Sequence, residues 1–111
     1  MMRAVWKDVV LAEAEHTVRL EGNHYFPMES LNHEYFAPSD RTSVGPWKGS
    51  ARYIDVVVGD AVNPAAAWHY PNPSEAAREI TNHVAFWRGV RIETSGDEPA
   101  PRRRLWSRPR S

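Results

Sequence analysis

The sequence predicts a small, mainly β domain, and three observations lead to this fold class. Residues that favour turns, such as Gly, Pro, Asn and Asp, recur about every eight to twelve residues along the chain. Thr17 to Glu21 alternates apolar and polar residues, as a half-buried strand does. Tyr53 to Val58 is rich in β-branched and aromatic residues and is the best strand candidate.

The first half of the chain predicts short strands joined by tight turns. The elements expected here are, in order, a hairpin of residues 5–6 and 9–13 around Lys7-Asp8, a strand over 17–21, a turn at Gly22-Asn23, a strand over 24–26 ended by Pro27, one helical turn over 29–33 and a loop at 38–40. No internal repeat interrupts this order, so we expect a single sequence of short elements.

The second half opens on the rigid turn Gly45-Pro46-Trp47-Lys48-Gly49, which leads into the strand over 53–58. A hairpin turn at Gly59-Asp60 should follow. Pro64 predicts an irregular start to residues 62–70, with strand near Trp68. Ser74 is the expected N-cap of one short helix near residues 74–81. Residues 84–87 and 90–93 are then predicted to form a closing hairpin around Arg88-Gly89.

Charge and composition divide the chain into two parts. We expect residues 1–96 to form a single β domain, with nine Lys and Arg against twelve Asp and Glu. Residues 97–111 carry five Arg against two acidic residues, together with three Pro, and predict a flexible tail. The tail is expected to act in solubility, and it would add at most a weak contact with nucleic acid, because five arginines give little affinity at physiological salt.

Several classes of protein do not fit this composition. The chain has no cysteine, which excludes disulfides, thiol catalysis and cysteine zinc sites. It has no long apolar run and no secretory leader at its start, so we expect a cytoplasmic protein without a membrane partner. The five histidines are scattered singly, and we therefore expect neither a metal site nor a cofactor.

Aromatic and charged residues near the turns form the candidate site. Trp47 and Lys48 are held by the glycines and proline of their turn, and Lys48 could bind a phosphate or a carboxylate. Four further aromatic residues could line a pocket, although a domain of this size also needs large core residues: Tyr25, Tyr53, Trp68 and Tyr70. Trp6, Phe86 and Trp87 are assigned to packing from their places in strand patterns.

Glu21 is the best candidate carboxylate, because it is expected at the end of an alternating strand. Beside Lys48 it could form a proton-transfer couple or a clamp for a ligand. A structural ion pair is the alternative interpretation of the same two residues.

Four ordered blocks of the sequence resemble the domain-of-unknown-function 427 family. The blocks are Glu21 to Pro27, Pro46 to Gly49, Ala67 to Pro71 with Pro73, and Val84 to Phe86, and the resemblance covers roughly residues 4–93. The family implies small antiparallel sheets packed as a β-tent, similar to the Mss4-like class. Related β-tent proteins hold zinc through paired cysteines, which this chain lacks, and Gly45 stands where members of the family often have a cysteine.

Two functions remain open from the sequence. The first is a module that binds a small anionic or peptide-like ligand at the aromatic and lysine site. The second is an enzyme that uses Glu21 and Lys48 for acid–base chemistry, or for the nucleotidyl transfer that some classifications of the family suggest. Nucleotidyl transfer normally needs clustered carboxylates for Mg²⁺, and the sequence contains no Asp-x-Asp. The oligomeric state does not follow from these residues.

Overall fold

Two antiparallel sheets make up the chain in a computed structural model, which describes residues 1–45 and 48–94. The smaller sheet has the strand order β2-β1-β9, and the larger has the order β3-β4-β8-β7-β6-β5. The strands are β1 (Met2–Trp6), β2 (Val9–Ala14), β3 (Val18–Leu20), β4 (Asn23–Pro27), β5 (Phe36–Gly45), β6 (Gly49–Val58), β7 (Ala61–His69), β8 (His83–Phe86) and β9 (Arg91–Thr94). The prediction of a mainly β fold with small antiparallel sheets is confirmed.

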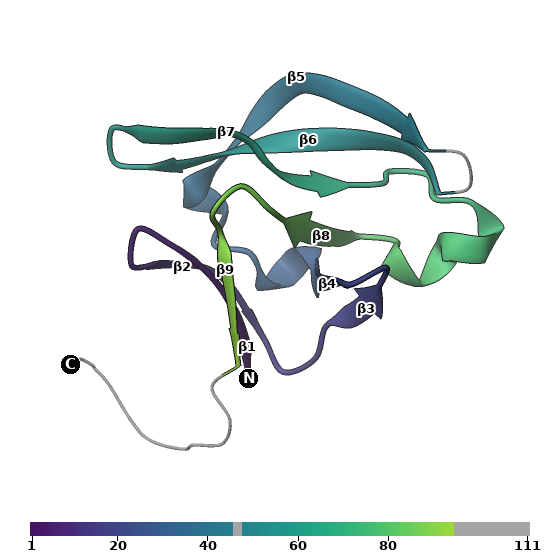
Figure 1. The fold of residues 1–111 in the computed structure, drawn as a ribbon, viewed down its shortest axis with the longest axis horizontal. Helices are drawn as coiled ribbons and strands as arrows, with labels where there is room; N and C mark the ends of the chain where they lie inside the picture. Colours follow the sequence, from purple (N-terminus) through teal and green to yellow (C-terminus); the bar gives the residue numbers. More distant parts are fainter. Residues whose placement is uncertain (46–47, 95–111) are drawn as a thin grey trace.

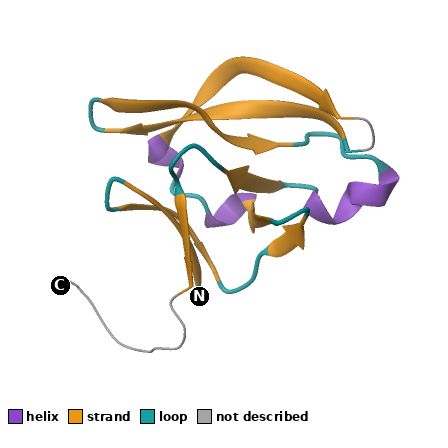
Figure 2. Ribbon diagram, in the orientation of Figure 1, coloured by secondary structure: helices purple, strands orange, loops and turns teal. Residues whose placement is uncertain are grey.

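The two sheets cross each other in space. Strands β5, β6 and β7 run together along the top of Figure 1, and β1 and β9 of the smaller sheet run across that direction below them. Helical structure in the described ranges is limited to three 3-10 segments, η1 (Met28–Ser30), η2 (His33–Tyr35) and η3 (Glu75–Ile80), which lie below the long strands (Figure 2). No helix within these ranges has the length and apolar character needed to cross a membrane.

The larger sheet is buried on both faces at β4 and β8, because successive residues of a strand point to opposite faces. Phe26 and Phe86 point into a core between the two sheets, where they pack edge to face with ring centroids 5.7 Å apart. Their sequence neighbours Tyr25 and Ala85 point to the opposite face, into a second core that η3 covers with Ile80. Continuous apolar runs in the sequence therefore mark strands that are buried on both sides.

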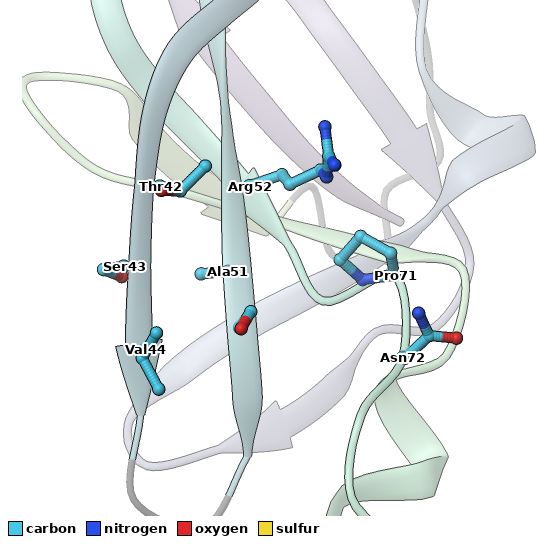
Figure 3. Close-up of a pocket in the computed structure, with 8 residues that line it drawn as sticks. Thr42, Ser43, Val44, Ala51, Arg52, Pro71 and Asn72 are labelled. Carbon is cyan, nitrogen blue, oxygen red and sulfur yellow. The ribbon is translucent and has the colours of Figure 1, made fainter.

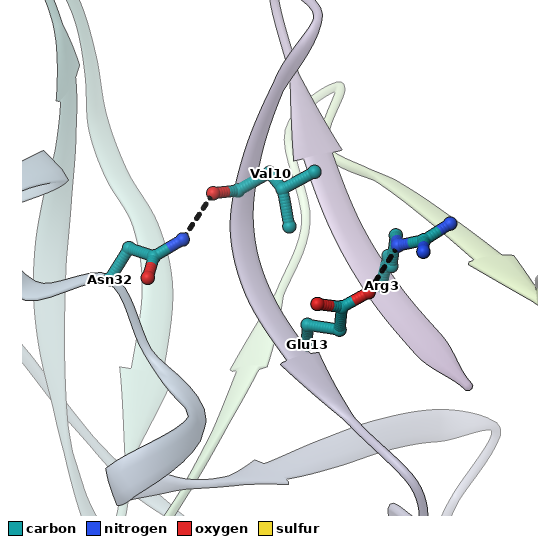
Figure 4. Close-up of polar contacts among 4 residues, drawn as sticks. All are labelled: Arg3, Val10, Glu13 and Asn32. Atoms are coloured by element: carbon teal, nitrogen blue, oxygen red, sulfur yellow. Dashed lines mark hydrogen bonds and ion pairs between the residues drawn. The ribbon is translucent and has the colours of Figure 1, made fainter. Parts of the chain in front are cut away.

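The outer edge of the smaller sheet is closed by the segment that precedes η2. Asn32 donates its side-chain amide to the Val10 carbonyl at 2.8 Å (Figure 4). Its backbone N–H donates to the Leu11 carbonyl at 2.8 Å. On the other side of β2, Arg3 of β1 donates to the Glu13 carboxylate at 2.6 Å. The two bonds from Asn32 satisfy backbone groups of β2 that an open edge strand would leave unpaired.

Three expected elements differ in the structure. Residues 38–40 are not a loop but part of the ten-residue edge strand β5, which accommodates Pro38 and shifts register between Pro38 and Thr42. The helix expected near residues 74–81 is the 3-10 segment η3, bent at Ala77, and Ser74 precedes it without a side-chain capping bond. The single helical turn over 29–33 is two short 3-10 turns, η1 and η2.

The expected closing hairpin is also wrong. Strand β8 pairs with β4 and β7 in the larger sheet, whereas β9 pairs with β1 in the smaller one. The Arg88-Gly89 turn therefore carries the chain from one sheet to the other. The turn between β3 and β4 is Glu21-Gly22 rather than Gly22-Asn23, so Glu21 belongs to the turn and not to the strand end. The tail 97–111 lies outside the described residues.

We predict that Gly49→Ala destabilises the domain more than Gly59→Ala does. Gly49 has φ +104°, and a Cβ there would lie 3.1 Å from the Asn72 carbonyl oxygen. Gly59 has φ +60°, and a Cβ there would meet no atom within 4 Å. An alanine at this position would therefore suffer only the backbone strain of a left-handed conformation. Urea unfolding should show a loss of about 2–3 kcal/mol for Gly49→Ala and about 1 kcal/mol for Gly59→Ala. Equal losses would contradict the close approach at Asn72.

Candidate functional site

Five aromatic side chains, one lysine and one asparagine line a cavity of about 140 Å³ at the second core. We call it the aromatic cavity, and its lining residues are Asn23, Tyr25, Lys48, Tyr53, Trp68, Tyr70 and Trp87. They come from β4, β6 and β7 and from the segments that follow β5, β7 and β8. The cavity therefore depends on how strands from distant parts of the sequence pair.

The register of three strands places the rings together. Tyr53 of β6 pairs with Trp68 of β7, and Trp68 pairs with Ala85 of β8, so the three side chains lie on one face. Trp87 lies two residues beyond Ala85 and follows the same alternation. Ring centroids are 6.4 Å apart for Tyr53 and Trp68, 5.6 Å for Trp68 and Trp87, and 6.0 Å for Tyr53 and Trp87. The small side chain of Ala85 leaves room beside these rings.

Polar atoms of the rings are held in defined places. Trp68 donates its indole N–H to the Tyr25 hydroxyl at 3.3 Å, and the two rings meet edge to face. The Tyr53 hydroxyl lies 3.3 Å from the Ser43 hydroxyl on β5. Burial raises the pKa of Tyr70, which outweighs the opposing charge of Lys48. Tyr70 is therefore a neutral hydroxyl at physiological pH.

Lys48 and Glu21 form an ion pair at the edge of the cavity. The Lys48 side chain is only 14% exposed, whereas that of Glu21 is 45% exposed. Burial lowers the pKa of Lys48, but the hydrogen bond to Glu21 and the nearby Tyr70 and Tyr25 outweigh that effect, so the pKa is raised overall. Lys48 is therefore a cation at neutral pH, with its ammonium 5.8 Å from the Tyr70 ring centroid.

The backbone at Glu21 is unusual for its residue type. Glu21 has φ 52° and Gly22 has φ 82° in the two-residue turn between β3 and β4. Asn, Asp and Gly are favoured at the first of these positions because they tolerate positive φ. A glutamate there accepts the strain, and its longer side chain reaches Lys48.

A bulge in β7 positions the wall of the cavity. Ala65 has φ 54°, and its backbone N–H donates to the Asp55 carboxylate at 2.8 Å. Trp87 donates its indole N–H to the Ala65 carbonyl at 2.6 Å and its backbone N–H to the Ala66 carbonyl at 3.0 Å. The bulge therefore fixes the indole of Trp87, which is nevertheless 38% exposed.

Two arginines lie over the exposed rings. The Arg41 guanidinium is 5.0 Å from the Tyr53 ring centroid and 5.8 Å from that of Trp87. Arg88 lies 4.7 Å from the Trp87 ring centroid, and its guanidinium donates to the Pro64 carbonyl at 3.0 Å. Cations over ring faces in this range interact favourably with the aromatic quadrupole. The rim of the cavity thus carries positive charge.

The structure brings together most of the residues that the sequence proposed for a site. Tyr25, Lys48, Tyr53, Trp68 and Tyr70 all line the aromatic cavity. Trp47 lies outside the described residues. Glu21 contacts Lys48 but is not part of the lining.

Sequence reasoning missed three contributors to this region, Trp87, Asn23 and Arg41. Trp87 was assigned to packing, yet it is partly exposed and lines the cavity. The signal that could have found it is the period of two, because Trp87 shares a strand face with Ala85 and not with Phe86. Phe26 is fully buried, whereas Trp68 is only partly buried and faces the cavity.

Neither His24 nor His69, each a sequence neighbour of a residue in the lining, lines the aromatic cavity itself. His24 pairs with Arg19 across β3 and β4 and is 2.7 Å from the Thr17 hydroxyl through Nδ1. His69 pairs with Arg52 across β6 and β7. Within residues 1–45 and 48–94, no group of three His, Asp or Glu side chains could hold a metal ion.

Comparison with known proteins gives one family. The model of a family described as a domain of unknown function (DUF427) matches residues 1–97. No curated protein matches the chain.

We predict that Glu21→Asn is more stable than Glu21→Gln. Both variants lose the ion pair, but Asn tolerates the positive φ at this position better than Gln does. The free energies of unfolding of the two variants in urea should differ by about 0.5–1 kcal/mol, which is part of the cost of placing a residue other than glycine in the left-handed conformation. Glu21→Gln as the more stable of the two would show that the turn does not strain residue 21.

We predict that the domain loses stability on mild acidification, in part through His69. Burial, followed by the positive charge of Arg52, lowers the pKa of His69 from its ordinary value of 6.5. The unfolded chain then takes up a proton before the folded chain does, so stability is present above pH 6.5 and falls as the pH drops below it. Melting curves between about pH 7.5 and 5.5 should show a smaller fall for His69→Gln than for the wild type. An equal loss of melting temperature in the wild type and in His69→Gln would show that His69 does not cause the acid sensitivity.

Proposed function

The chain belongs to the DUF427 family, and we propose that it binds a small anionic ligand with a single planar ring in the aromatic cavity. The observation that carries this proposal is the position of Lys48, whose side chain is only 14% exposed, among five aromatic side chains around one cavity. Ligand sites are typically apolar hollows with a few convergent polar groups that fix orientation. The aromatic cavity has that composition.

The size of the cavity supports a ligand with one ring. Its volume is about 140 Å³, and an apolar cavity of about 150 Å³ is known to accommodate benzene. A fused ring system or a peptide backbone would not fit inside it. A peptide-like ligand would therefore insert one side chain only, with its backbone remaining outside.

The charges around the cavity support an anion. Lys48 lies in the lining, and Arg41 and Arg88 lie over the rings at the rim. A ligand carboxylate would either share the Lys48 ammonium with Glu21 or displace the Glu21 carboxylate from it. Displacement is feasible because the Glu21 side chain is nearly half exposed, so water can solvate its carboxylate after release. A cationic ligand would meet three positive side chains, so we expect it to be rejected.

An enzyme that uses Glu21 and Lys48 is the second candidate, and the direct contact between the two side chains favours it. The raised pKa of Lys48 opposes a role as general base, because an efficient base has a pKa near the working pH. Lys48 would instead act as an electrostatic stabiliser or an acid. The described residues contain no cluster of three or more carboxylate or histidine side chains that could hold the Mg²⁺ ions of nucleotidyl transfer. The binding module is therefore our preferred function.

We also propose that the two sheets form a β-tent of the Mss4-like class. The supporting observations are the two crossing antiparallel sheets and the core that they enclose. A comparison of an experimental structure with β-tent domains would test the assignment, and a different strand order in the sheets would refute it.

We predict that benzoate binds more tightly than either benzyl alcohol, which lacks the charge, or acetate, which lacks the ring. The change in intrinsic tryptophan fluorescence, to which Trp68 and Trp87 in the lining contribute, provides the measurement. Lys48→Met should weaken benzoate binding about tenfold or more, because a hydrogen bond to a charged group contributes about 1.5–3 kcal/mol. It should leave benzyl alcohol binding nearly unchanged.

Two further variants serve as controls for this experiment. Arg91→Gln removes a positive charge from β9 in the smaller sheet and should not change benzoate binding. Trp87→Leu removes a partly exposed ring and should weaken both ring-containing ligands while the melting curve stays cooperative. Equal affinities for benzoate and benzyl alcohol, or no effect of Lys48→Met on a folded protein, would refute the proposal.

A further inference from the structure

A second and larger hollow lies at the β5–β6 hairpin, next to the segment that follows β7. This cleft has a volume of about 420 Å³, within the usual range of small-molecule sites. Thr42 on β5, Ser50 and Arg52 on β6, and Pro71 and Asn72 after β7 line it. Figure 3 shows the Arg52 side chain extending from β6 toward Pro71, with Thr42 on the neighbouring strand.

Strand pairing places polar side chains in a row beside this cleft. Thr42 pairs with Arg52 across β5 and β6, and Arg52 pairs with His69 across β6 and β7. Residues directly opposite each other in antiparallel strands lie on the same face, so a hydroxyl, a guanidinium and an imidazole adjoin one another. Ser50 lies two residues before Arg52 and therefore shares its face.

The chemistry of the cleft suits an oxyanion. Its lining combines the Arg52 guanidinium with three hydroxyl groups and the Asn72 amide, and it includes no carboxylate. Elsewhere in the described residues, Arg3, Arg78 and Arg91 each pair with a glutamate. Within the same residues no carboxylate lies within ion-pair distance of Arg52. A guanidinium offers a planar set of donors that matches two oxygens of a phosphate.

We propose that this cleft binds the phosphate group of a small phosphorylated polyol, with Arg52 as the main anion ligand. The hydroxyl and amide groups of the lining would bind the polyol hydroxyls. No aromatic side chain lines the cleft, so nothing there would favour a ligand by stacking. The site does not depend on the function proposed for the aromatic cavity, because the two linings have no residue in common.

NMR titration of the full chain tests the proposal with inorganic phosphate, glycerol 3-phosphate and glycerol, at an ionic strength kept constant with sodium chloride. Saturable shifts are expected for the backbone amides of Ser50 and Asn72 and for the His69 imidazole. Glycerol 3-phosphate should bind more tightly than inorganic phosphate, and glycerol should cause no saturable shift. Equal affinities for the two phosphates would refute the polyol part of the proposal.

Arg52→Gln should weaken glycerol 3-phosphate binding at least tenfold. Arg91→Gln removes the same charge from the smaller sheet and should leave the affinity unchanged. An equal loss in both variants would show that the binding reflects net charge alone and would overturn the site. Shifts that do not saturate, or that occur only at residues of the aromatic cavity, would also overturn it, whereas benzoate binding would remain unaffected by either result.

Discussion

The register of β6, β7 and β8 is the constraint on which the rest of this molecule depends. It pairs Tyr53 with Trp68 and Trp68 with Ala85, and so sends these side chains to one face of the larger sheet. A slip of one residue would send them into the core between the sheets, where Phe86 lies. Because a core lies on each face of the sheet at these strands, neither core could accept the exchange without voids or clashes.

A single carboxylate helps to fix this register. The pairing of β6 and β7 shifts between Ile54 and Val56, and Asp55 accepts a hydrogen bond from the displaced backbone of Ala65 at the shift. The carbonyls that the bulge presents then accept both N–H groups of Trp87. The last wall of the aromatic cavity therefore depends on a side chain that does not line it. The Glu21–Lys48 pair fixes the opposite side, by joining the β3–β4 turn to the start of β6.

Local patterns in the sequence could predict the fold class and most of the cavity lining, but not the way distant strands pair. Alternation and turn residues identify strands wherever one face differs from the other, and tyrosines and tryptophans with polar tips indicate a pocket rather than a uniform core. Strand β5 was missed because Pro38 and its polar neighbours resemble a loop, and an edge strand tolerates both. The prediction of a hairpin around Arg88-Gly89 was wrong because a tight turn does not determine which sheet each flanking strand joins.

The β5–β6 hairpin separates two kinds of chemistry by the period of two along its strands. Tyr53 faces the rings of the aromatic cavity, beside the partly buried Lys48. Arg52 faces the hydroxyl-rich cleft, where recognition of an anion depends on paired hydrogen bonds. Ser43 lines the cleft and lies beside the Tyr53 hydroxyl. The two proposed sites therefore share β6 without sharing a lining residue, and they adjoin at the contact between Ser43 and Tyr53.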